Sequence, residues 1–354
     1  MKINPNSPIL VTGANGYVAS WIVKKLLDQG HTVNAAVRNP NDKAKHAHLL
    51  SLSEDSKGEL KLFHSDLLEE GSFDEAIQGC ELVYHTASPF TTDVKNPEKE
   101  LIQPAVKGTQ NVLNSALKAS SVKRVVVTSS CAAMYTDAID TLNTPTGMLT
   151  ESVWNETASI DYQPYNLSKT LAEKKAWEIA KSQNKFDLIT INMSLVLGPP
   201  LNPKHATSES MNILKLLGNG DMKFGVPKMG VGLVDVRDVA EAHYLAGFNP
   251  KAEGRYITSA HNTNFLEMSE ALLPRYGDNY PLPKRALPKW LLLLFGPMVN
   301  SLFTRRFIKN NVNVEWKADN SKVKSHLGLS FLSLKTTMDD SFQALIDAGV
   351  LSSK

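Results

Sequence analysis

The sequence predicts an α/β fold, a doubly wound parallel sheet with a smaller C-terminal lobe. Short runs rich in Val, Ile and Leu alternate with helical patterns through the first half of the 354 residues. These runs are apolar on both faces, as the strands of a buried parallel sheet are. After residue 198 the sequence turns rich in proline and loop-forming residues, which indicates a separate lobe.

The elements follow in order along the chain. The expected strands are 8–12, 32–38, 60–66, 82–88, 124–130 and 187–198. The expected helices are 17–29, 72–78, 99–119, 165–183 and 334–347. Segment 232–260 has a strand–helix–strand pattern and is expected to rejoin the sheet. The sheet domain is therefore predicted to comprise 1–198 with 232–260, and the lobe 199–231 with 261–354.

Composition narrows the class of protein. Hydrophobic residues make up 42% and charged residues 21%, values that are ordinary for a globular protein. The net charge of +2 comes without basic blocks, which argues against nucleic acid as a partner. The cysteines, Cys80 and Cys131, suit neither a disulfide framework nor a metal site. The N-terminal MKINPNSPILVTG lacks a signal-peptide pattern, so we expect a cytoplasmic location.

One stretch is unusually apolar. Residues 290–304, WLLLLFGPMVNSLFT, carry no charge and precede two arginines. The run is shorter than the roughly 20 apolar residues of a spanning helix, and Gly296-Pro297 interrupts it. A buried or pocket-covering helix is the favoured interpretation, and a contact with a membrane surface is the alternative.

A glycine-rich loop follows the first strand in TGANGYVASW. Gly13 and Gly16 allow a tight turn and a close approach of pyrophosphate to the backbone, and Ala19 is the third small position. The helix that begins near Tyr17 directs its N-terminal amides at such a phosphate. The loop therefore predicts a dinucleotide site and a Rossmann-type sheet.

The second strand indicates which dinucleotide binds. Arg38 stands where an NAD enzyme usually has an acidic residue, and its planar guanidinium suits the 2′-phosphate of NADP(H). Lys45 could add charge or be a solvated surface cation. Asp66, at the end of the third strand, could meet the adenine or cap the next segment.

A candidate proton donor opens the helix expected at 165–183. Tyr165 and Lys169 are four residues apart, which places them on one helical face. The lysine ammonium stabilises a phenolate, and the tyrosine can deliver a proton to a carbonyl oxygen. The same spacing recurs at Tyr280 and Lys284, but prolines there make a helix implausible. A serine at the end of the fifth strand, Ser129 or Ser130, could polarise that oxygen or cap the strand end.

Six segments together carry a family resemblance: TGANGYVASW, GSFDEAIQGC, RVVVTSS, YNLSKTLAE, VLGP and NPKAEGRYI. The chain resembles an extended short-chain dehydrogenase/reductase, most closely the dihydroflavonol 4-reductase and cinnamoyl-CoA reductase branch. The likeness runs from about residue 8 to about residue 260. It implies an NADPH-dependent carbonyl reductase with a catalytic triad of Ser130, Tyr165 and Lys169 and a lobe that binds substrate.

The resemblance also implies a set of contacts. Cofactor contacts map onto Gly13, Gly16, Tyr17, Val18, Arg38, Lys45, Asp66, Leu67, Ala87, Tyr165, Lys169 and Val196. Substrate contacts map onto Ser130, Tyr135 and Tyr165. Tyr135 replaces the Asn of flavonoid reductases, which favours an aldehyde or ketone other than a flavonoid. Family members occur as monomers and homodimers, and both remain open.

Three functions remain in competition. The first is reduction of an aldehyde or ketone with NADPH. The second is an NAD(P)-dependent epimerase, dehydratase or hydroxysteroid-type dehydrogenase. Arg38 argues against an epimerase or dehydratase, because such enzymes commonly hold NAD. The third is a non-catalytic cofactor-binding protein, which would not need the three triad residues.

Overall fold

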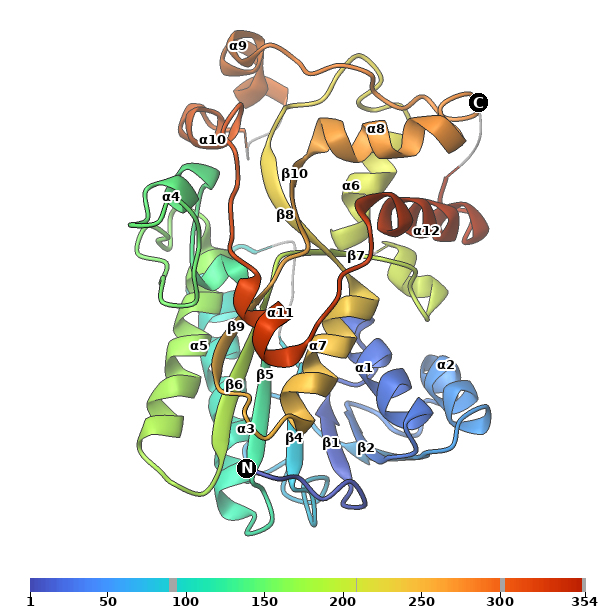
Figure 1. The fold of residues 1–354 in the computed structure, drawn as a ribbon, viewed down its shortest axis with the longest axis vertical. Helices are drawn as coiled ribbons and strands as arrows, with labels where there is room; N and C mark the ends of the chain where they lie inside the picture. Colours follow the sequence, from blue (N-terminus) through green and yellow to red (C-terminus); the bar gives the residue numbers. More distant parts are fainter. Residues whose placement is uncertain (89–93, 208, 300–302, 352–354) are drawn as a thin grey trace.

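The computed structural model describes residues 1–88, 94–207, 209–299 and 303–351. Its main sheet has seven parallel strands in the order β3-β2-β1-β4-β5-β6-β9 (Figure 1). Their bounds are β1 Ile9–Thr12, β2 Thr32–Val37, β3 Glu59–His64, β4 Leu82–His85, β5 Arg124–Ser130, β6 Asp187–Met193 and β9 Gly254–Thr258. The strand order reverses between β1 and β4, and ligands bind open α/β sheets at the carboxyl end of such a switch point.

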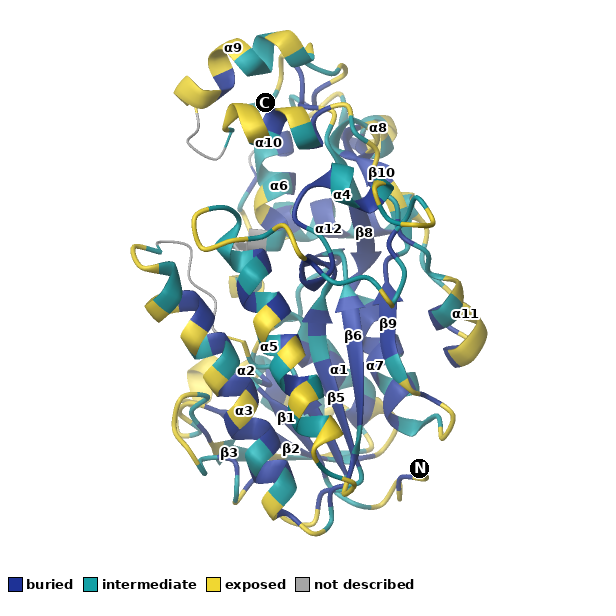
Figure 2. Ribbon diagram, turned by 90° about the vertical axis from the view of Figure 1, so that its left-hand side faces the viewer, coloured by how far each residue is buried: buried dark blue, intermediate teal, exposed yellow. Residues whose placement is uncertain are grey.

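Helices cover both faces of this sheet, as the alternating pattern predicted. On one face α3 (Gln103–Lys118) packs against α5 (Pro164–Lys181). On the other, α1 (Tyr17–Asp28) lies between α2 (Lys43–Glu54) and α7 (Val236–Phe248) (Figure 1). All residues of β1 and β4 are buried, so their apolar runs fill the layer between the helices (Figure 2). The fold class is confirmed.

The C-terminal lobe is built on a second sheet of three strands in the order β10-β8-β7. These are β7 (Leu195–Leu197), β8 (Gly230–Asp235) and β10 (His261–Asn264). Helices α6 (Glu209–Gly218), α8 (Phe265–Tyr276) and α12 (Leu334–Asp347) enclose a core that includes Leu214, Leu272 and Phe342. The remaining α-helices of the described residues are α4 (Ala138–Leu142), α9 (Lys289–Val299), α10 (Arg305–Asn311) and α11 (Ser321–Leu327).

Several predicted elements need correction. The expected strand 187–198 is two strands, because β7 leaves the large sheet to pair with β8. Within 232–260, α7 and β9 return to the large sheet, whereas β8 belongs to the lobe. Segment 72–78 forms consecutive turns, and the helix expected at 99–119 begins with a π-helical turn, Glu98–Ile102. The composition of a segment does not show which strand it will pair with or whether a regular helix will form.

Of the two favoured interpretations of 290–304, a buried or a pocket-covering helix, the buried one is wrong for α9. Leu291, Leu292 and Leu293 are half-buried, but five large apolar side chains are exposed, among them Leu294 (54%) and Met298 (82%). Residues 300–302 of the predicted segment lie outside the described residues. Among those described, no helix combines the length and the apolar character needed to cross a bilayer.

We predict that Gly247→Ala destabilises the fold through contact between α7 and β4. A Cβ at Gly247 would lie 2.0 Å from the hydroxyl oxygen of Tyr84. Overpacking of this kind costs about 1–3 kcal/mol, whereas Gly→Ala in an unhindered helix stabilises by about 1 kcal/mol. Urea unfolding measures whether the free energy of unfolding falls or rises in the variant.

Tyr84→Phe is the matched control. The Tyr84 hydroxyl is buried and has no hydrogen-bond partner among the described residues, so its removal alone should cost little. Combined with Gly247→Ala, it should recover part of the lost stability because the nearest atom is gone. A Gly247→Ala protein as stable as the wild type would contradict the packing argument.

Candidate functional site

The glycine-rich loop forms one wall of a cavity at the switch point of the large sheet. Gly13 has a φ of +60°, and a Cβ there would lie 3.0 Å from the Cα of Ala87, so only glycine fits. Gly16 is the N-cap of α1. The cavity measures about 550 Å³. Of the predicted cofactor residues it is lined by Gly13, Gly16, Arg38, Lys45, Asp66, Leu67 and Ala87.

Hydrogen bonds to the side chain of Thr12 hold Thr86 and Ala87, which line this cavity, in place. Oγ1 of Thr12 accepts from the backbone amides of Thr86, at 3.1 Å, and Ala87, at 3.0 Å. With both amides donating, the Thr12 hydroxyl proton is directed at Nδ1 of His85, 3.0 Å away. Burial, assisted by the charge of Lys169, lowers the pKa of His85 to about 3. The imidazole is therefore neutral at physiological pH.

The lining of the cavity fits a dinucleotide. Oδ1 of Asn15 is buried and has no hydrogen-bond partner among the described residues, and Asn15 lines the cavity between the two glycines. Arg38 and Lys45 supply cationic side chains on the β2 side. Oδ1 of Asp66 accepts from the amide of Leu68 at 2.8 Å, so the capping alternative for Asp66 is present in the structure.

Five predicted cofactor residues do not line this cavity: Tyr165 and Lys169, which belong to α5 (Pro164–Lys181), and three residues that lie together elsewhere. Tyr17, Val18 and Val196 pack together in a cluster between α1 and β7. The hydroxyl of Tyr17 donates to the carbonyl of Gly198 at 2.8 Å, and burial raises its pKa well above the ordinary value. Their contacts with a cofactor stay a prediction.

Helix α5 brings Tyr165 and Lys169 together. The chain enters it through Gln163, whose φ of 57° is left-handed, and Pro164 takes the first helical position. Nζ of Lys169 lies 5.5 Å from the centroid of the Tyr165 ring and donates to Oγ of Ser88 at 2.9 Å. Ser88 lines the cavity described above, so Lys169 stands between the tyrosine and that cavity.

The two serines at the end of β5 have different surroundings. Ser129 is buried, and its hydroxyl donates to Glu173 of α5 at 2.5 Å. Ser130 is only half-buried, and its Oγ accepts from the amide of Ala132 at 3.1 Å. Because strand residues alternate, only Ser130 is available to a ligand, which supports the choice made from the sequence.

Tyr135, the third predicted substrate contact, lies on the loop after Ser130. Its backbone carbonyl accepts from Nδ2 of Asn166 on α5 at 2.8 Å. Its ring meets Trp316 edge-on, with centroids 5.7 Å apart, and burial raises the pKa of its hydroxyl well above the ordinary value. Trp316 also lines a second cavity of about 900 Å³ along segment 313–320.

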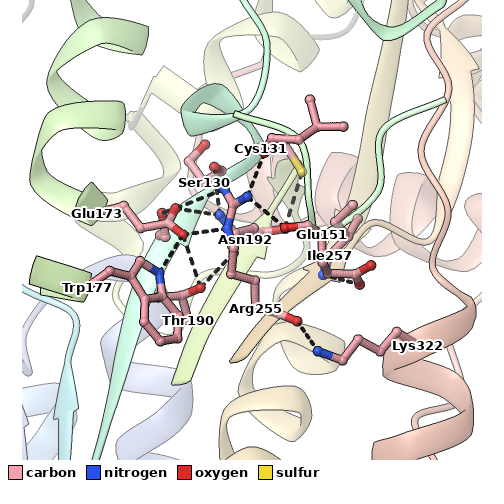
Figure 3. Close-up of polar contacts among 12 residues, drawn as sticks. Ser130, Cys131, Glu151, Glu173, Trp177, Thr190, Asn192, Arg255, Ile257 and Lys322 are labelled. Atoms are coloured by element: carbon pink, nitrogen blue, oxygen red, sulfur yellow. Dashed lines mark hydrogen bonds and ion pairs between the residues drawn. The ribbon is translucent and has the colours of Figure 1, made fainter. Parts of the chain in front are cut away.

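A buried carboxylate anchors α5 beneath the site (Figure 3). Each oxygen of Glu173 accepts three hydrogen bonds, and their donors come from α5, β5, β6 and β9. Those donors are Arg255 (2.7 and 3.5 Å), Ser129 (2.5 Å), Asn192 (2.7 Å), Thr190 (3.2 Å) and Trp177 (3.3 Å). The guanidinium of Arg255 also donates to the carbonyls of Glu151 and Val153 and lies 4.0 Å from the centre of the Trp154 ring.

Sequence reasoning missed three of these residues. Thr12 and Ser88 act through contacts made only after β1 and β4 have paired. Glu173 did leave a signal, because it follows Tyr165 and Lys169 at the same four-residue interval and so shares their helical face.

We predict that Glu173→Ala lowers the free energy of unfolding by about 3–5 kcal/mol, the cost of leaving a buried charge without its partner. Arg255 would keep its burial but lose its only carboxylate among the described residues. Glu178→Ala is the control on the same helix, since that carboxylate is 68% exposed and paired with Lys175. It should change stability by less than about 1 kcal/mol. Similar losses in the two variants, measured by urea unfolding, would contradict the role given to Glu173.

Comparison with known proteins places this site in a family. The pattern of the NAD dependent epimerase/dehydratase family matches residues 9–257. Cinnamoyl-CoA reductase CAD2 of Medicago truncatula is 45% identical over 80% of the chain and 84% of its own length. Tetraketide alpha-pyrone reductase 1 of Arabidopsis thaliana is 40% identical over 97% of both chains.

A solved structure agrees in fold. Gre2 of Candida albicans in complex with NADPH has a TM-score of 0.77 and 29% identity, over 97% of this chain and 99% of its own. The predicted family and the predicted oxidoreductase are confirmed, and the predicted cofactor, NADP(H), is the one that this Gre2 structure holds. The chain belongs to the NAD dependent epimerase/dehydratase family, as an oxidoreductase related to the cinnamoyl-CoA and dihydroflavonol reductases.

Proposed function

We propose that the chain is an NADPH-dependent reductase that converts the carbonyl group of an aldehyde or ketone into an alcohol, with Ser130, Tyr165 and Lys169 as its catalytic residues. The observation that carries the proposal is the position of Lys169. Its ammonium lies beside the Tyr165 ring and bonds to Ser88 at the edge of the dinucleotide cavity. This position supports a proton donor next to the cofactor.

The residues divide the work of the reaction. When bound, NADPH supplies the hydride that adds to the carbonyl carbon. Tyr165 donates its hydroxyl proton to the carbonyl oxygen, which completes the alcohol. Ser130 donates a hydrogen bond to the same oxygen and polarises it, and the Lys169 ammonium stabilises the phenolate left behind. The neutral state of His85 leaves this ammonium without a competing cation beside it.

Arg38 supports NADPH over NADH. Its guanidinium lines the cavity after β2, where a carboxylate would bind the ribose hydroxyls of NAD. A guanidinium forks onto the oxygens of a 2′-phosphate, and Lys45 on the same side adds positive charge. Gre2 of Candida albicans, which shares the fold, binds NADPH.

The substrate we propose is an aldehyde or ketone with an aromatic or other apolar body. The half-buried ring of Tyr135, on the loop after Ser130, packs edge-on against the buried ring of Trp316, and aromatic rings favour contact with further aromatic groups. The relatives support the reaction class but do not agree on one compound, since their names include a cinnamoyl thioester and a tetraketide pyrone.

We predict that Tyr165→Phe lowers kcat by about 10²–10⁴-fold, the usual contribution of a positioned proton donor, while NADPH affinity stays unchanged. NADPH oxidation by the pure protein is followed against a panel of aromatic aldehydes, aliphatic ketones, a dihydroflavonol and a ketosteroid. Tyr280→Phe, at the second match to the same spacing, should retain full turnover. Equal turnover in Tyr165→Phe and the wild type would contradict the assignment.

A second prediction concerns the cofactor. Arg38→Asp should raise the Kd of NADPH about ten- to a hundredfold, the value of losing a charge-assisted hydrogen bond, and leave that of NADH nearly unchanged. Fluorescence titration of both cofactors measures the two constants. Lys251→Asp makes a similar charge change at an exposed position in the loop before β9 and should alter neither. A parallel loss for NADH and NADPH would show that Arg38 has a structural role instead.

A further inference from the structure

Helix α9 exposes an apolar side that the proposed reaction does not use. Ten large hydrophobic side chains are exposed in the described part of the chain, and five of them belong to this one helix. Their exposed fractions are 66% for Trp290, 54% for Leu294, 47% for Phe295, 82% for Met298 and 84% for Val299. Exposed apolar residues gathered in this way mark a surface that binds a membrane, another protein or a ligand.

The opposite side of α9 holds the helix in place. Gly296 is buried, and a Cβ there would lie 3.0 Å from Ile308 of α10 and 3.4 Å from Phe303. The ammonium of Lys289 donates to the carbonyls of Lys309, at 2.9 Å, and Val312, at 2.7 Å. The apolar side is therefore turned outward by packing on α10, at the end of the molecule opposite the N-terminus (Figures 1 and 2).

The sequence segment that contains α9 carries charge of one sign. Residues 279–314 contain no Asp or Glu, although the whole chain has 36 acidic residues against 38 Lys and Arg. The basic residues of this segment are Lys284, Arg285, Lys289, Arg305, Arg306 and Lys309. Arg305 and Lys309 are exposed on α10, the helix that carries α9.

We propose that this surface rests on a membrane that contains anionic lipid. We define the α9 surface as Trp290, Leu294, Phe295, Met298 and Val299 with Arg305 and Lys309. A short helix with an apolar side and basic flanks lies in the interface between water and lipid, with its apolar side chains among the acyl chains. The absence of acidic residues from 279–314 matches the negative potential of an anionic leaflet.

A second copy of the chain fits this surface less well. Two copies related by a twofold axis would meet through the same patch, so each basic side chain would face basic side chains of its partner. Since 279–314 offers no carboxylate, such a contact would have no ion pairs within this segment. A lipid headgroup layer supplies the missing negative charge.

Flotation of the full-length protein with vesicles tests the proposal. The vesicles are phosphatidylcholine alone or with about 30% phosphatidylserine, in about 50 mM and about 500 mM salt. We expect the wild type to float with the anionic vesicles at low salt. In the other three conditions it should stay unbound at the bottom of the gradient. Failure to float on anionic vesicles at low salt, or equal flotation on neutral vesicles, overturns the proposal.

Two variants on the α9 surface separate the contributions. Leu294→Ser with Met298→Ser removes apolar area without changing charge and should abolish flotation. Arg305→Glu with Lys309→Glu should weaken binding at least about 25-fold, from roughly fivefold for each basic side chain near an anionic surface. Flotation of either variant at the wild-type level overturns the proposal.

Controls of the same chemistry lie elsewhere. Leu171→Ser alters an exposed leucine on α5, and Lys2→Glu with Lys251→Glu makes the same charge change near the N-terminus, where Met1 bonds to Pro250. Both should float like the wild type, and their failure would show that the effect is not specific to α9. Sedimentation equilibrium tests whether a second copy of the chain occupies the surface instead. If the wild type does not float but forms a dimer, and Leu294→Ser with Met298→Ser dissociates that dimer, the surface belongs to a second copy.

Discussion

The arrangement of the site depends on the buried carboxylate of Glu173. A charge in the interior is tolerated only when its oxygens are fully hydrogen-bonded, and here donors from β5, β6, β9 and α5 itself converge on it (Figure 3). Lys169 and Tyr165 stand four and eight residues before Glu173 on the same helix. A helix is stiff over two turns, so the point that ties α5 to three strands also fixes the height of the ammonium and the phenol above the sheet.

A second set of contacts sets the distance from this helix to the dinucleotide cavity. Thr12 ties the end of β1 to the segment after β4, and Ser88 of that segment accepts from Lys169. The carboxyl ends of β1 and β4, next to the glycine-rich loop, are thus joined to α5 through hydrogen bonds. Burial keeps His85 neutral at the centre of this arrangement, with a pKa of about 3, so Lys169 is the charge that the tyrosine meets. Lys169 thus supplies the positive charge beside the Tyr165 ring.

The parts of the site that could be predicted from the sequence are those fixed by neighbours along the chain. Gly13 combines a left-handed φ with a Cβ position 3.0 Å from the Cα of Ala87, a combination that suits glycine, and the pairing of Tyr165 with Lys169 follows from helical spacing. Ser88 and the donors to Glu173 could not be predicted, because strands distant in sequence bring them together. The division of 187–198 between two sheets could not be predicted for the same reason, since both halves are apolar and largely buried. The exposed side of α9 was misjudged because apolar composition does not say whether anything covers it.

Helices α9 and α10 are connected through Asp137 to the segments that carry Tyr135 and Tyr165. Its two carboxylate oxygens accept from Asn310 and Asn311 of α10 at 2.8 and 2.7 Å, and both accept from the hydroxyl of Tyr162. Tyr162 precedes Tyr165 by three residues, and Asp137 follows Tyr135 by two. Arg306 reinforces the joint, because its guanidinium lies 3.8 Å from the centre of the Tyr162 ring. Through α10 and Asp137, α9 is therefore joined to the two segments that carry Tyr135 and Tyr165.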